Sequence, residues 1–194
     1  MRELVYFIAV TLDGFIAGPG DQFDGFVYEG DHVAAIGEKY RGAVPTHLAE
    51  SVGLATEGGP FDTVLMGWNT YSMGLPDAPS PYRHLRQVVF TRTHAAPAEA
   101  EGVEFTDRDP VEVVRELKAE EGGAIWLCGG AALAAQLVDE IDRLALKVHP
   151  VLFGSGIPVF GARPYAPERW HPLSTTAFTS GVTLAEYTRL APKG

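Results

Sequence analysis

Twice along this chain, a short apolar segment of strand length runs into glycine and is followed by residues at helical spacing. The first such segment is 63–66, which Gly67 stops, and the second is 124–128, which Gly129 and Gly130 follow. Strands that alternate with helices are typical of a largely parallel sheet covered by helices, so these two units constrain the fold class most. In the second unit, the apolar residues at helical spacing are Leu133, Leu137, Val138 and Ile141.

Further segments extend this pattern on both sides. Leu4–Val10 is a predicted buried strand, and a long loop that starts with turn residues follows it. Asp109, Pro110 and Glu112 supply the N-cap, the first-turn proline and the capping-box acid of a predicted helix. The last third of the chain has strand-like composition with a hairpin turn at Ser180 and Gly181, which predicts an antiparallel edge. No repeat or long linker interrupts residues 1–194, so one α/β domain is expected.

Charge and composition exclude several classes of function. The formal net charge is -10, from 25 acidic and 15 basic residues, and this excess repels a nucleic-acid backbone. No apolar run near the start approaches the length of a membrane-spanning helix or resembles an export signal, and Cys128 is the single cysteine. We therefore expect a cytoplasmic protein without a nucleic-acid or membrane partner.

One stretch is locally basic. Residues 78–98 contain no Asp or Glu. Two interpretations stay open, a solvated rim of the sheet or a site for a small anion. The basic residues of this stretch are Arg83, His84, Arg86, Arg92 and His94.

The common catalytic signatures are absent from the sequence. It contains no phosphate loop, no nucleophile elbow, no zinc-binding His-Glu-x-x-His, and no Gly-x-Gly-x-x-Gly after the first strand. The six histidines show no ligand-like pairing, so no metal site is expected. The two strand-glycine-helix junctions remain, either as simple turns or as a pair of backbone N–H clusters that bind a pyrophosphate. Because Arg92 follows a strand end where an acid would bind the ribose of NAD, the second interpretation favours NADP.

Four segments in this order resemble the dihydrofolate reductase superfamily, and more closely the reductase domain of the riboflavin-pathway bifunctional deaminase-reductase and its stand-alone relatives. The resemblance runs from residue 3 to about residue 190 and implies a three-layer α/β/α fold. It also implies a homodimer and NADPH bound across the carboxyl ends of the strands. The segments are Phe7–Gly14, Gly67–Tyr71, Ile125–Gly130 and Pro150–Gly156.

The resemblance also assigns roles by position. Ala9 would bind the nicotinamide carboxamide through its backbone, and Ile16 would pack beside the ring. Thr91 and Arg92 would bind the 2'-phosphate of the adenosine. The residues implied at the phosphates and the nicotinamide side are Gly67, Asn69, Thr70, Gly129, Gly130, Ala131 and Ala132.

The expected function is NADPH-dependent transfer of a hydride to a C=N or C=O bond of a small substrate, either a pyrimidine- or pterin-like heterocycle or a carbonyl compound. The reaction needs a proton as well, for which Asp13 is the candidate donor, although an Asp-Gly pair after a strand is also an ordinary turn. Cys128 stands where the riboflavin-pathway reductases carry a glutamate. The open alternatives are 5-amino-6-(5-phosphoribosylamino)uracil reduction, folate reduction, and a nucleotide-binding or ligand-sequestering protein without turnover.

Overall fold

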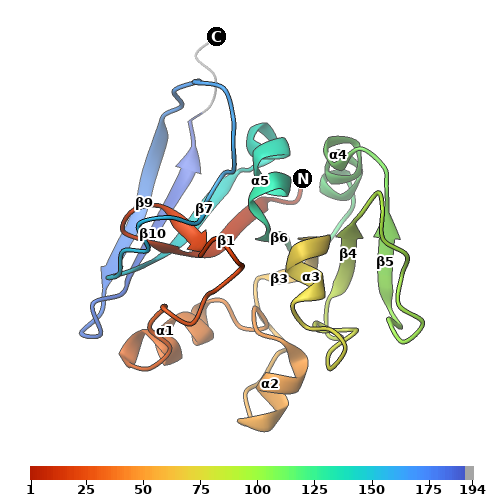
Figure 1. Ribbon diagram of the computed structural model, residues 1–194, viewed down its shortest axis with the longest axis horizontal. Helices are drawn as coiled ribbons and strands as arrows, with labels where there is room; N and C mark the ends of the chain where they lie inside the picture. Colours follow the sequence, from red (N-terminus) through yellow and green to blue (C-terminus); the bar gives the residue numbers. More distant parts are fainter. Residues whose placement is uncertain (191–194) are drawn as a thin grey trace.

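The centre of the protein is an eight-stranded mixed sheet, seen in a computed structural model that describes residues 1–190 (Figure 1). The strand order is β5-β4-β3-β6-β1-β7-β10-β9. All pairs from β5 to β7 are parallel, whereas β10 is antiparallel to both β7 and β9, which confirms the predicted sheet. The strands are β1 (Leu4–Thr11), β3 (Phe61–Gly67), β4 (Arg86–Phe90), β5 (Val103–Thr106), β6 (Ala124–Gly129), β7 (Arg143–His149), β9 (Trp170–Ala177) and β10 (Thr183–Arg189).

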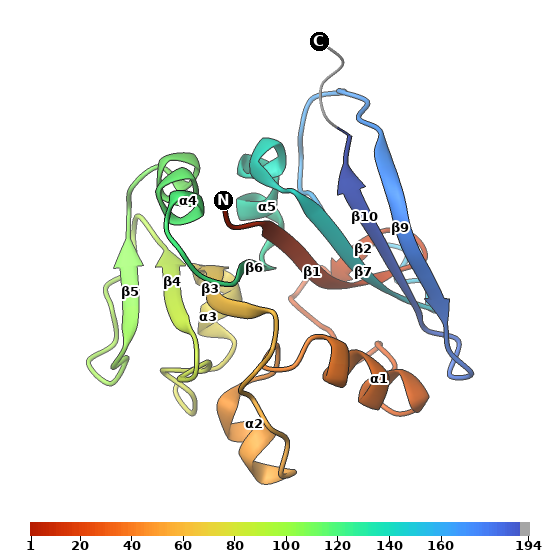
Figure 2. The same ribbon diagram turned by 180° about the vertical axis from the view of Figure 1, so that it is seen from behind.

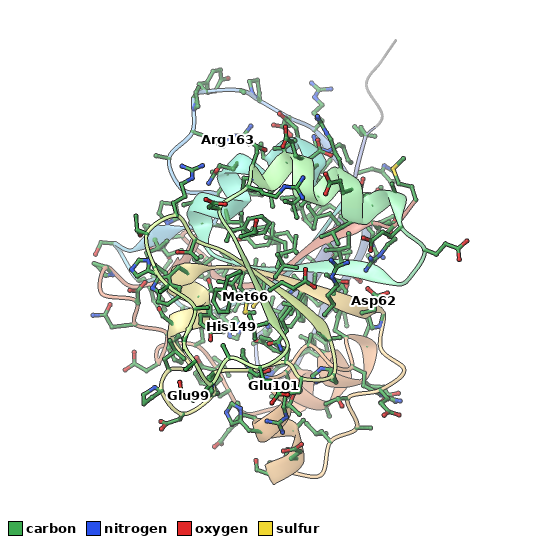
Figure 3. The ribbon with its side chains drawn as sticks, turned by 90° about the vertical axis from the view of Figure 1, so that its right-hand side faces the viewer. Asp62, Met66, Glu99, Glu101, His149 and Arg163 are labelled. Atoms are coloured by element: carbon green, nitrogen blue, oxygen red, sulfur yellow. The ribbon has the colours of Figure 1, made fainter. Side chains whose placement is uncertain are left out.

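Helices cover both faces of this sheet, as Figures 1 and 2 show. On one face lie α4 (Pro110–Ala119) and α5 (Ala131–Gln136), which pack on strand residues such as Tyr6 and Leu127. On the other face lie α1 (Asp31–Lys39), α2 (Thr46–Ser51) and α3 (Trp68–Ser72). Alternate strand residues, among them Phe7 and Trp126, form the second core there. The protein is therefore a three-layer α/β/α structure with two apolar cores.

The start of one helix follows its local sequence signal, whereas the end of another does not. Asp109 caps α4 as predicted, because its Oδ1 accepts hydrogen bonds from the backbone N–H groups of Val111 (2.8 Å) and Glu112 (3.3 Å). The helix predicted up to Ile141 is shorter: α5 ends at Gln136, and a 3-10 turn, η1 (Val138–Glu140), leads into β7. The apolar spacing continues there because Val138 of the turn and Ile141 after it are buried as well, so spacing alone could not locate the helix end.

Asp31 connects α1 to a distant turn. It is the first residue of α1, and Gly30 precedes it with a φ of 130°. Its carboxylate accepts hydrogen bonds from the backbone N–H groups of Thr179 (2.9 Å) and Ser180 (3.1 Å). Those hydrogen bonds lower the pKa of Asp31 to about 2. Asp31 therefore ties α1 to the turn between β9 and β10.

A small two-stranded ribbon was not anticipated. It consists of β2 (Phe15–Ala17) and β8 (Ile157–Pro158), which pair antiparallel. Both strands are too short to show an alternating pattern in the sequence. No helix among residues 1–190 has the length and the apolar composition needed to cross a membrane.

Candidate functional site

One large cavity opens at the carboxyl ends of the parallel strands. Its volume is about 1370 Å³, and it is lined by residues of β1 and by residues at the ends of β3, β4 and β6 or just after them. The edge where parallel strands end is where open α/β sheets place their ligands. All eleven residues assigned to a cofactor line this single cavity: Ala9, Ile16, Gly67, Asn69, Thr70, Thr91, Arg92, Gly129, Gly130, Ala131 and Ala132.

The two glycine junctions lie side by side. A Cβ atom on Gly67 would be 3.6 Å from the backbone nitrogen of Gly130 and 3.9 Å from the carbonyl oxygen of Gly129. Gly129 has a φ of 143°, which side chains rarely adopt, and its peptide bond to Gly130 is cis. A Cβ atom on Gly129 would also meet the hydroxyl of Thr70 at 3.2 Å. The two junctions are therefore in van der Waals contact, and the backbone of Gly129 has a conformation that favours glycine.

The helices that start at these junctions are short. α3 has five residues and α5 has six, so most of their N–H groups belong to the first turn. A helix dipole acts mainly within that turn. The chemistry available here is consequently a cluster of backbone N–H groups together with the Thr70 hydroxyl and the Asn69 amide, which line the same cavity.

The basic stretch 78–98 divides into structural and cavity-lining residues. Arg83 pairs with Glu50, and Arg86 pairs with Glu104 and Glu120. His84 is held between Thr46 and the carbonyl oxygen of Gly42. Arg92 and His94 line the cavity instead, and within the described chain no carboxylate forms an ion pair with Arg92. Only the part of the stretch that follows β4 is thus available to an anion.

An aromatic stack lies beside Arg92. The rings of Trp68 and His94 are 4.2 Å apart and 5° from parallel, and both residues line the cavity. Trp68 begins α3, and His94 is held by hydrogen bonds with Thr91 and Thr93. A flat surface of this kind suits the face of a nucleobase.

Asp13, the candidate proton donor, is used elsewhere. It does not line the cavity, and its carboxylate accepts hydrogen bonds from the Thr11 hydroxyl (2.5 Å) and from the N–H groups of Phe153 (3.2 Å) and Gly154 (2.7 Å). The hydrogen bond from Thr11 is the main reason why the pKa of Asp13 is lowered. These contacts favour a structural role that joins the turn after β1 to the loop after β7. A catalytic role for Asp13 stays a prediction without support from this geometry.

Sequence reasoning missed several polar residues of the cavity, among them Tyr82 and Lys147. The Tyr82 hydroxyl lies 3.8 Å from the Cys128 sulfur, and the Lys147 ammonium lies 4.4 Å from the centre of the Phe7 ring. Burial raises the pKa of Tyr82 well above its ordinary value and raises the pKa of Cys128 to about 11, so both groups are neutral at pH 7. Burial lowers the pKa of Lys147. Strand alternation could have revealed Lys147, because it shares the inward face of β7 with Ala145.

Within residues 1–190, no group of three or more His, Cys, Asp or Glu side chains comes together in a way that could hold a metal ion.

The mixed sheet, its order and the cavity at the strand ends define a protein of the dihydrofolate-reductase-like α/β class. The sequence profile of the family described as RibD C-terminal domain matches residues 2–184, and the chain belongs to this family. That family is the reductase domain of riboflavin biosynthesis, so the chain is reductase-like.

Two proteins of Bacillus subtilis (strain 168), both described as uncharacterized, are similar in sequence. YwjB is 33% identical over 165 residues, which cover 82% of this chain and 83% of YwjB. YyaP is 28% identical over 174 residues, which cover 82% of this chain and 80% of YyaP.

Two solved structures share the fold. A putative riboflavin biosynthesis protein from Shewanella sp. PV-4 superposes with a TM-score of 0.71 at 21% identity, covering 98% of this chain and all of the other. A Thermotoga maritima diaminohydroxyphosphoribosylaminopyrimidine deaminase/5-amino-6-(5-phosphoribosylamino)uracil reductase superposes with a TM-score of 0.64 at 18% identity. The superposition covers 97% of this chain and 57% of that bifunctional protein.

Proposed function

We propose that this protein is an NADPH-dependent reductase that acts on a C=N or C=O bond of a small planar heterocycle or carbonyl compound. The observation that carries the proposal is the single cavity, which joins the paired glycine junctions and Arg92 to an aromatic region at Phe7, Trp126 and Tyr82. Cavities of about 300–1,000 Å³ hold one drug-sized ligand, so a volume of about 1370 Å³ leaves room for a dinucleotide and part of a second molecule.

The residues present fit NADPH. The bare backbone at Gly129 and Gly130 permits close approach of a pyrophosphate, which the hydroxyl of Thr70 would also contact. Arg92, which forms no ion pair among residues 1–190, provides a guanidinium for the 2'-phosphate. Bound NADPH would supply the hydride. The protein's own part would then be to orient both molecules and to exclude water from the apolar end of the cavity.

The proposal is tested first by binding and then by turnover. We expect NADPH to bind and to quench tryptophan emission, because Trp68 and Trp126 both line the cavity. A panel of pterins, folates, aminopyrimidine ribosides and simple aldehydes, mixed with protein and NADPH, should then include one compound that consumes the reduced cofactor. Binding without consumption by any compound would support a sequestering protein instead. Absence of binding would remove the reductase proposal.

A second prediction concerns the choice of cofactor. Replacing Arg92 by alanine should reduce the preference for NADPH over NADH by about 10- to 100-fold, because a charge-assisted contact with the 2'-phosphate is lost. Fluorescence titration with both nucleotides measures the preference. Arg115→Ala is the matched control, since Arg115 pairs with Glu140 and does not line the cavity. An unchanged preference in Arg92→Ala would exclude Arg92 from the 2'-phosphate site.

A further inference from the structure

Lys147 occupies an unusual position for a lysine. It lies on β7 directly across from Ala9 of β1, on a strand that is buried in the middle of the sheet. Ala145 of the same strand belongs to the core on the α1 face, and residues two apart on a strand share a face. The side chain of Lys147 therefore enters the cavity, where its ammonium lies 4.4 Å from the centre of the Phe7 ring.

The ammonium of Lys147 has no counter-charge among residues 1–190. The other two lysines of this part of the chain are both paired, Lys39 with Glu186 and Lys118 with Asp142. The titratable groups that face Lys147 are the thiol of Cys128 and the ring of His149, and the Tyr82 hydroxyl contacts that thiol. None of these three groups supplies a negative charge at neutral pH, since the pKa values of Cys128 and Tyr82 are raised.

An ammonium without a counter-charge is unfavourable at a half-buried position unless a group of opposite charge comes near it. Removing an ammonium from water costs several kcal/mol when no opposite charge compensates it. A contact with the face of an aromatic ring returns about 2 kcal/mol at most. The lowered pKa of Lys147, caused by burial, has the same origin. Lys147 is half-buried at the cavity wall, so an anion that enters the cavity would supply the counter-charge that its ammonium lacks.

The walls near Lys147 restrict the shape of that anion. Phe7 and Trp126 lie 6.2 Å apart, Trp126 and Tyr82 lie 5.0 Å apart, and all three rings line the cavity. The Trp126 indole N–H is already used, because it donates to the Phe7 carbonyl oxygen at 3.0 Å. These aromatic surfaces suit a flat ring that carries one anionic group, which the ammonium of Lys147 would bind.

From this arrangement the geometry points to Lys147 as the residue that determines substrate specificity, by binding an anionic oxygen carried on a planar ring. Carboxylates and ionised ring oxygens of acidic heterocycles share this chemistry. The inference rests on the proposed function, because it identifies the class of the second molecule beside the nucleotide. It places the anion at the β1–β7 end of the cavity, apart from Arg92, which follows β4.

Two matched probe pairs test the inference. The first is 2-naphthoate against 2-naphthamide, and the second is 5-nitrouracil, whose ring is ionised at neutral pH, against uracil. Each is titrated without nucleotide and with saturating NADP⁺, so that the result does not depend on cofactor binding. We expect the wild-type protein to bind the anion of at least one pair on the order of 10-fold more tightly than its neutral partner. The pair that shows the preference distinguishes a carboxylate from a ring oxygen.

Variants then locate the preference. Lys147→Met keeps the length of the side chain and should lose the preference, whereas Lys147→Arg should retain most of it. Arg115→Met removes one positive charge from an exposed position outside the cavity and should behave as wild type. NADPH binding should survive in Lys147→Met, which separates this inference from the proposed function. Equal binding within both pairs by the wild type, or a preference that persists in Lys147→Met, would overturn it.

A second readout does not require any variant to fold. With lysine labelled at its ε-carbon, NMR titration follows the protonation of Lys147 beside that of the paired Lys39. Addition of 2-naphthoate, or of 5-nitrouracil if that pair shows the preference, should raise the pKa of Lys147, because a bound anion stabilises the ammonium. The neutral partner should leave it unchanged, and the Lys39 signal should not respond. A Lys147 titration that both members of each pair leave unaltered would contradict the inference.

Discussion

Replacing Glu186 by alanine is expected to lower the free energy of unfolding by about 3 kcal/mol, measured by chemical denaturation. The side chain of Glu186 is only 2% exposed, and it accepts hydrogen bonds from Lys39, Tyr40 and Ser174. Burial alone would raise its pKa, but these hydrogen bonds outweigh burial and lower it. Alanine would leave the hydroxyls of the buried Tyr40 and the half-buried Ser174 without their acceptor.

The matched control is Glu116→Ala. Glu116 pairs with Arg108 at 2.6 Å, but both side chains are at least half exposed, so the expected cost is below about 1 kcal/mol. Similar losses in both variants would show that the interior position of Glu186 has no special importance. The effect of Glu186 should extend to the ligand cavity, because the ring of Tyr40 stacks on that of Phe7 at 4.2 Å.

The second large effect depends on pH. Stability should decrease by up to about 3 kcal/mol when the pH is lowered from 6.5 to 4, because His149 must be neutral in the fold. Burial, followed by the charges of Lys147 and His32, lowers the pKa of His149 from 6.5 to about 4. The unfolded chain therefore binds more protons than the folded one between these two values, and protonation favours unfolding.

The contacts of the His149 ring explain why it must be neutral in the fold. Its Nδ1 accepts a hydrogen bond from the backbone N–H of Val27 at 3.1 Å, and its ring packs on that of Phe26. Denaturation at a series of pH values measures the slope. His149→Gln should flatten this slope above pH 4.5, where most carboxyl groups with a lowered pKa are still charged. His171→Gln, at an exposed position of β9, should leave the slope unchanged. A slope that His149→Gln leaves intact would assign the pH dependence to another group.

The parts of the fold that depend on local chemistry could be predicted from the sequence. The cap at Asp109, the strands that stop at Gly67 and Gly129 and the antiparallel hairpin at Gly181 are each determined by a few neighbouring residues. Elements that depend on distant partners could not be. The ribbon of β2 and β8 is fixed by pairing across more than a hundred residues, and α2 lies in a segment broken by turns.

The candidate site divides in the same way. The glycine junctions and Arg92 follow strand ends, so their common edge could be inferred from the order of strands and helices. Tyr82 reaches the cavity from an irregular segment, where the backbone N–H of Tyr82 donates to the Gln87 side chain at 2.9 Å. No periodicity marks that position. Lys147 did carry a signal, a charged residue at an inward position of an apolar strand, which sequence reasoning overlooked.

The outer edge of the sheet, formed by β9 and β10, has a different relation to the cavity. Among residues 1–190, neither strand contributes a residue to the cavity walls, but β10 supports them, because Leu184 pairs with Lys147 of β7 and Glu186 holds Tyr40, which stacks on Phe7. The exposed side chains of β9 can therefore change without altering the cavity walls. Descendants of one ancestor would diverge there freely in their surfaces and assemblies while they conserve a common chemistry.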